Sequence, residues 1–116
     1  MHPRVFIFAS VGARLTDNAG NAQFGQAILQ IRVLVNGTPV AGSKTVVTDY
    51  DYDGFGDYVV TGGNAVIAGF PVNVTPGNST TVTLQWAVVR LWSATPWQLR
   101  CAPGVGEDHA VLTVLD

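Results

Sequence analysis

The segment TDYDYDGFGDYVV, residues 48–60, contains the densest group of side chains that could do chemistry in this chain. It holds four of the eight acidic residues of the sequence within nine positions, Asp49, Asp51, Asp53 and Asp57. Carboxylates this close together repel one another unless a cation or solvent relieves the repulsion. Alternate carboxylates can converge on one calcium ion, and a glycine such as Gly54 allows the sharp turn that brings a later ligand round. The spacing therefore predicts a calcium site formed by these four aspartates.

The pattern D-x-D-x-D-G-x-x-D resembles the calcium loops of integrin-type propeller repeats and the first half of an EF-hand loop. Position 12 of an EF-hand would be Val60 here, so the usual bidentate glutamate is missing, and Asp57 is the natural substitute. A second interpretation stays open, in which the segment is a solvated turn and Asp and Gly are present for turn geometry. Calcium is the one cofactor that the sequence suggests.

Aromatic side chains alternate with the aspartates of this segment. They are Tyr50, Tyr52, Phe55 and Tyr58. On a β-strand they would lie on the opposite face from the carboxylates, because successive side chains point to opposite faces. We therefore expect these four rings to pack against a neighbour, which in an oligomer would be another subunit.

Two tryptophans flank a proline-containing turn in RLWSATPWQLR. Trp92 and Trp97 could together form an aromatic platform for a sugar ring. The alternative is that they fill the core or a subunit interface, where Trp is enriched. The second interpretation is favoured, since no cluster of Asn, Asp and Arg accompanies them to fix sugar hydroxyls. Trp86 lies in an alternating apolar pattern and is expected in the core.

The sequence gives little support to an enzyme. Cys101 and His109 are formally a Cys-His pair, but no local signature or orienting partner accompanies them. The chain contains no G-x-S-x-G, no phosphate-binding loop and no His-rich metal spacing. Cys101 is also the only cysteine, so no intrachain disulfide can form. We expect a protein without catalytic activity.

The composition indicates a chain that contacts other protein chains. It is 47% hydrophobic and 12% charged, whereas soluble domains average roughly 25% charged residues. Large exposed apolar area usually marks an interaction site, and obligate interfaces resemble a core cut in half. The net charge is −2 and the six basic residues are dispersed, which argues against nucleic-acid binding. No run approaches the roughly 20 apolar residues of a membrane-spanning helix, and residues 5–13 are expected to form a strand rather than a signal-peptide core.

Nearly every segment has the pattern of a β-strand, and no window has a convincing helical period. Asn36-Gly37 is a strong hairpin signal, and Pro71 indicates a break or an edge position. Seven to nine short strands with frequent turns are typical of an antiparallel β-sandwich. We expect one domain over residues 1–116. The expected strands are 4–11, 26–36, 44–49, 57–61, 64–70, 71–75, 79–91, 97–101 and 109–115.

Three segments together resemble the second half of a jelly roll of the tumour necrosis factor type, which includes the globular heads of complement's first component. They are KTVVTDYDYDGFGDYVVTGGNAVIAG, VTPGNSTTVTLQWAVV and HAVLTVLD. The family's Asp-Tyr-x-Tyr segment and Thr-Gly-Gly turn correspond to residues 49–52 and 61–63. The chain departs from the family before residue 26, where one strand and a Gly/Asn-rich stretch stand in place of several strands. The resemblance implies a jelly-roll homotrimer packed along an apolar threefold axis.

Similar trimeric heads occur as spikes, fibre tips and capsid decorations of bacterial viruses. We therefore expect a structural virion protein of a bacteriophage, with other virion proteins such as a major capsid protein as partners. The alternative is a calcium-dependent, extracellular β-sandwich module that binds carbohydrate or protein. Neither interpretation involves a membrane or a nucleic acid.

Overall fold

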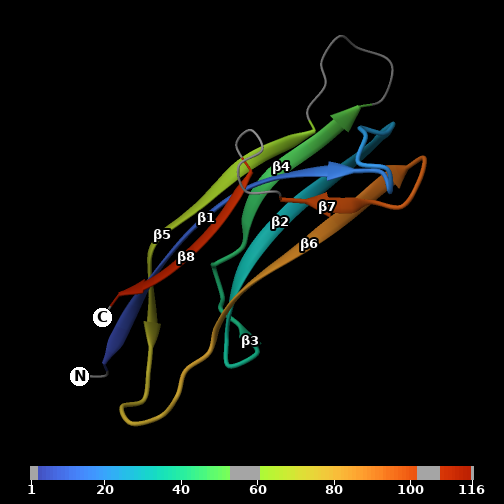
Figure 1. The fold of residues 1–116 in the computed structure, drawn as a ribbon. Coiled ribbons are helices and arrows are strands. Elements are labelled where there is room, and N and C mark those ends of the chain that lie inside the picture. The colour runs from blue at the N-terminus through green and yellow to red at the C-terminus, as the bar shows by residue number, and fades with distance from the viewer. Residues whose placement is uncertain (1–2, 53–60, 102–107, 116) are drawn as a thin grey trace.

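The computed structural model describes residues 3–52, 61–101 and 108–115 (Figure 1). The described residues form eight strands and no helix, and they therefore include no helix that is long and apolar enough to cross a membrane. This confirms the prediction of an all-β antiparallel sandwich of seven to nine strands. The strands are β1 (Arg4–Thr16), β2 (Gly25–Val35), β3 (Thr38–Pro39), β4 (Thr45–Tyr52), β5 (Gly62–Asn73), β6 (Val82–Ser93), β7 (Gln98–Arg100) and β8 (His109–Leu115).

The strands form two sheets, each built around one long central strand. In sheet A, β1 pairs with β5 along one edge and with β7 and β8 along the other. In sheet B, β2 pairs with β3 and β4 along one edge and with β6 along the other. The strands run along the long axis of an elongated molecule, whose two marked ends lie near each other (Figure 1). The last strand thus lies beside the first, and the long strand β6 lies beside β2.

The core lies between the two sheets and follows from strict alternation along the central strands. Every second residue of β1 from Ile7 to Leu15 is buried, and so is every second residue of β2 from Ala27 to Val33. A strand directs successive side chains to opposite faces, so these two series meet across the sandwich. The period of two that predicted the strands also selected the core residues.

One side of the sandwich, between β4 and β5, is closed by very close backbone packing. A Cβ atom on Gly63 would collide with the carbonyl oxygen of Val47, and one on Gly62 would lie 2.7 Å from the oxygen of Ala13. The resemblance placed these glycines in a turn, but the structure places them in strand β5. They are glycines because neighbouring backbones leave no room for a side chain.

Two local predictions are confirmed. Asn36 and Gly37 both have positive φ, at 49° and 82°, and they connect β2 to β3 as a hairpin turn. Pro71 does not interrupt its strand, because β5 runs through it as an edge strand of sheet A. An edge strand tolerates proline, since the missing N–H can face away from the ladder. The jelly-roll class and the trimer remain predictions.

Candidate functional site

The side of the sandwich opposite β4 and β5 is an apolar groove, which we call the seam groove. It runs between β6, at the edge of sheet B, and β8, at the edge of sheet A. Neither strand has a second partner among the described strands. The groove encloses about 260 Å³ and contains no charged residue. Its lining is Val11, Ala13, Leu29, Ile31, Val47, Leu84, Gln85, Trp86, Leu99, Cys101, Ala110, Val111 and Leu112.

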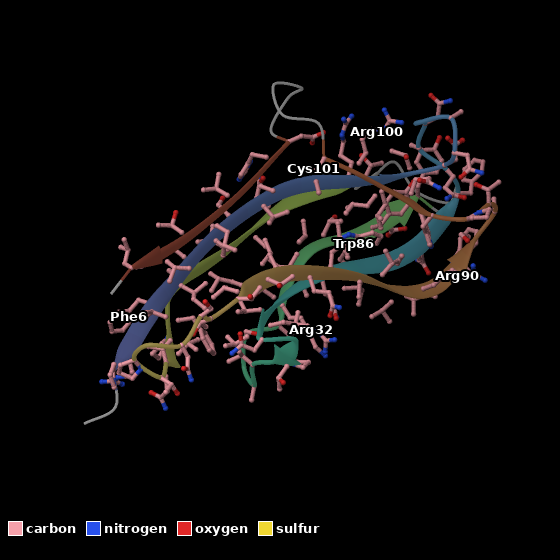
Figure 2. The ribbon with its side chains drawn as sticks, turned by 60° about the horizontal axis from the view of Figure 1, so that its bottom comes forward. Phe6, Arg32, Trp86, Arg90, Arg100 and Cys101 are labelled. Carbon is pink, nitrogen blue, oxygen red and sulfur yellow. The ribbon has the colours of Figure 1, made fainter. Side chains whose placement is uncertain are left out.

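Trp86 lies at the mouth of the seam groove, which corrects the expectation that it is a core residue. It pairs with Ile31 on the inward face of sheet B, so the alternation assigned its face correctly. It is nevertheless 51% exposed, because no described strand of sheet A extends far enough to cover it. In Figure 2, Trp86 lies between the two sheets, Cys101 lies beside β1, and the labelled arginines lie around the periphery.

The apolar surface continues along β8 beyond the seam groove. A second hollow shares Leu112 with the groove and adds Val82, Val114 and the turn at residues 74–78. Strand β8 reads HAVLTVL, and all its residues from Ala110 to Leu115 are exposed. A near-continuous apolar run is typical of a strand buried on both faces. Strand β8 therefore has the sequence of a buried strand, but in the single chain its side chains are exposed to solvent.

The outer side of sheet A bears a second apolar surface, which we call the A face. It consists of five exposed side chains from three adjacent strands, Phe6, Phe8, Val66, Val111 and Leu115. Arg4 and Arg14 occupy the same face at the two ends of β1, outside this group. Val111 belongs to both surfaces, so the seam groove and the A face meet along β8.

The structure describes two of the four aspartates proposed as calcium ligands. Asp49 and Asp51 lie on β4 and point away from the core, while Asp53 and Asp57 lie outside the described residues. Asp51 Oδ1 accepts a hydrogen bond from Gln26 Nε2 at 3.5 Å. Within the described ranges, no three His, Cys, Asp or Glu side chains gather as a metal site. The calcium site remains a prediction that depends on residues outside the described part.

Tyr50 and Tyr52, the described tyrosines of this segment, face inward, opposite to Asp49 and Asp51. Tyr50 has no exposed surface and packs edge-on against Trp97, with ring centroids 4.6 Å apart. Its hydroxyl donates to the Gln23 oxygen at 2.6 Å and accepts from the Gln23 N–H at 2.9 Å. Tyr50 thus fills the core of its own chain rather than a surface for another subunit. Tyr52 is half-buried against Phe24, and the other two proposed interface residues, Phe55 and Tyr58, lie outside the described residues.

Trp92 and Trp97 do not form a common platform, because they lie on opposite sides of sheet B. Trp97 packs inside, where its ring would lie 2.8 Å from a Cβ atom on Gly25. Trp92 lies on the outer side, and its Nε1 donates to Gln26 Oε1 at 3.2 Å. The preferred interpretation, a core residue, describes Trp97. Trp92 stays available on the surface beside Gln26 and Asp51.

Cys101 and His109 contact different partners. The thiol of Cys101 donates to the Gly12 oxygen at 3.4 Å. His109 Nε2 lies 2.6 Å from Ser10 Oγ, which links β8 to β1. Next to it, Arg14 donates to the buried carboxylate of Asp108 at 2.7 Å. The Ser10–His109 and Arg14–Asp108 pairs both hold the start of β8 against β1.

The comparisons with known proteins give no relative for this chain. No protein-family model matches it, and neither a curated protein nor a solved structure matches it. The jelly-roll resemblance therefore rests on the sequence segments that suggested it.

Sequence reasoning missed two features of the structure, one on the surface and one buried. Alternation alone could not show that none of the described strands covers Trp86. A better signal was available in HAVLTVL, because apolar residues at both parities predict cover on both faces of the strand. Gln23 was also missed: its side chain is buried, and its Oε1 accepts from the Thr95 N–H at 2.7 Å.

Proposed function

We propose that this protein is a non-enzymatic structural subunit of a bacteriophage particle that acts as a homotrimer. It would serve as a head decoration or as a small tail or fibre component. The observation that carries the proposal is the open side of the sandwich, where the seam groove and both faces of β8 are apolar and uncovered. The low charge of the chain supports the same function.

An apolar surface of this extent favours assembly over an isolated chain. Fully burying one large aliphatic or aromatic side chain stabilises by about 1.5–3 kcal/mol relative to leaving it exposed. Large contiguous apolar patches on soluble proteins mark interaction sites. The function is thus mechanical: subunits bury apolar surface against one another, and polar surfaces remain for contact with other virion proteins such as a major capsid protein. The number three follows from the jelly-roll resemblance.

The first experiment is the native mass by light scattering, with calcium and again after chelation. A trimer in both buffers supports the structural function with the aspartates as a turn. A trimer that dissociates or melts earlier after chelation supports the same function with calcium as a structural ion. A monomer in both contradicts the proposal. Sedimentation with assembled capsid shells and with empty controls then tests the virion assignment.

A second candidate is calcium-dependent binding of carbohydrate or protein on the outer side of sheet B. The observation that favours it is a broad depression along β4, part polar and part apolar. Its lining is Gln26, Val47, Thr48, Asp49, Tyr50, Asp51, Gly62 and Leu91. Trp92 borders it through its hydrogen bond to Gln26. If this function is correct, glycan or protein binding disappears on chelation and the fluorescence of Trp92 changes with ligand. Binding that is unaffected by chelation and by Asp51→Asn would contradict it.

A further inference from the structure

We propose that the seam groove of one copy binds the A face of the next copy, so that the copies close into a small ring. The inference rests on the proposed function, since it takes homo-oligomeric assembly as given. It adds which surfaces meet and that the contact joins two different surfaces rather than one surface to itself. The occupant of the seam groove is therefore a second copy of this chain.

The sequence and exposure of β8 require cover on two sides. Leu112 and Val114 lie on its inward side with Ala110, whereas Val111 and Leu115 lie on its outward side. A partner that covers only the groove side leaves the outward residues exposed together with Phe6 and Phe8. If each chain has two neighbouring copies, one can cover the inward residues of β8 and the other can cover its outward residues.

The chemistry of the two surfaces matches. No charged side chain lines the seam groove. Between Arg4 and Arg14, the described strand residues on the outward side of sheet A include no Lys, Arg, Asp or Glu, and the polar residues Ser10, His109 and Thr113 lie among the apolar ones. An apolar groove without charge gives no advantage to a charged partner, because burying an unpaired charge is costly. The same chain already provides a mainly apolar sheet face that can lie across the groove, with Phe6, Phe8 and Leu115 at one end of it. The outer side of sheet B is a poorer match, because Arg32, Asp49 and Asp51 interrupt its apolar residues.

The positions of the two surfaces favour a closed ring. The seam groove opens at the margin of the sandwich, and the A face lies on the adjoining flat side, with β8 between them. Contacts between two different surfaces form rings when the rotation closes and open filaments when it does not. When the two contact surfaces lie on adjoining sides of a subunit, each subunit is rotated by a large angle relative to the next. A ring with a large rotation between neighbours closes with few subunits.

The test uses two charge variants of exposed residues, mixed after purification. Trp86→Glu places a carboxylate at the groove, and Val66→Glu places one on the A face, where Val66 is 64% exposed. Each variant alone should be a monomer by light scattering and native mass spectrometry. Their equimolar mixture should form a one-to-one heterodimer of about twice the 12.3 kDa chain mass and nothing larger. In this heterodimer, the intact A face of the Trp86→Glu variant binds the intact seam groove of the Val66→Glu variant. The groove of the former and the A face of the latter carry the new carboxylates and bind no further copy.

The matched control is Val89→Glu, which places the same charge on the opposite face of β6 from Trp86. Val89 is 44% exposed, and its variant should assemble as the wild type does. Circular dichroism and thermal unfolding verify that all three variants fold. If both single variants are monomers and their mixture stays monomeric, the groove-to-face contact is wrong although the wild type assembles. A Val66→Glu variant that still forms the wild-type ring also overturns it. A monomeric wild type overturns the proposed function itself.

Discussion

Tyr50 shows how one side chain connects the sequence motif to the core. Its ring packs between the sheets, and its hydroxyl satisfies both backbone groups of Gln23. We expect Tyr50→Phe to lower the free energy of unfolding by about 1–3 kcal/mol, because it leaves a buried N–H and C=O without a partner. Urea denaturation measures the change. Tyr52→Phe, on the same strand but half-buried, should change stability far less, and an equal loss would contradict this assignment.

The same hydroxyl makes stability depend on alkaline pH. Burial raises the pKa of Tyr50 above its ordinary value of about 10, and its hydrogen bond with the Gln23 backbone partly opposes the rise. The folded state therefore favours the protonated phenol. The resulting stability is fully present below the ordinary pKa and is lost as the pH rises through the folded pKa. Urea midpoints should fall above about pH 10 in the wild type, with a shallower fall in Tyr50→Phe, and equal slopes would show that Tyr50 is not responsible.

At the scale of elements, the contrast between the two sides of the sandwich is decisive. Strands β4 and β5 approach so closely that Gly63 has no room for a Cβ atom beside Val47. Gly63→Ala should therefore destabilise the fold by about 1–3 kcal/mol, as overpacking in a tight interior does. Thermal unfolding measures this, with the adjacent exposed Asn64→Ala as control. A stability unchanged within error would mean that the two strands can separate at little cost.

Strands β6 and β8 show the opposite behaviour. Each has one edge without a partner among the described strands, and each carries exposed apolar residues. Unpaired edges are templates for association and are usually protected by charge, proline or short length. Strand β6 is long, and its single charged residue, Arg90, is near its end. An edge that is buried in an assembly does not need such protection. The near absence of charge and the absence of proline along these two strands are therefore consistent with burial in an assembly.

At the scale of the whole molecule, assembly through uncharged surfaces predicts weak dependence on salt. Charged contacts weaken with ionic strength as the Debye length shortens. The seam groove contains no charged side chain, so this weakening should not occur. Light scattering from about 0.05 M to about 1 M sodium chloride should give one native mass throughout. Dissociation at high salt would instead indicate contacts through the dispersed arginines and aspartates.

Local patterns in the sequence predict the all-β class and most of the strands. The strand patterns of 4–11 and 26–36 predicted most of the two central strands, and Asn36-Gly37 gave its hairpin, because these signals depend on neighbours in the chain. The two-sheet architecture followed from many short strands without a helical period. At the candidate site, the sequence correctly placed the aspartates and tyrosines of β4 on opposite faces.

Which apolar faces are covered within the chain depends on how the two sheets pack against each other. Tyr50 and Trp86 both lie on inward faces, yet Tyr50 is buried and Trp86 is exposed. The difference is that the sheets meet closely at β4 and β5, whereas they stay apart at β6 and β8. Local pattern fixes the direction of a side chain, but cover comes from strands distant in sequence. That long-range pairing separates the core from the seam groove that we assign to assembly.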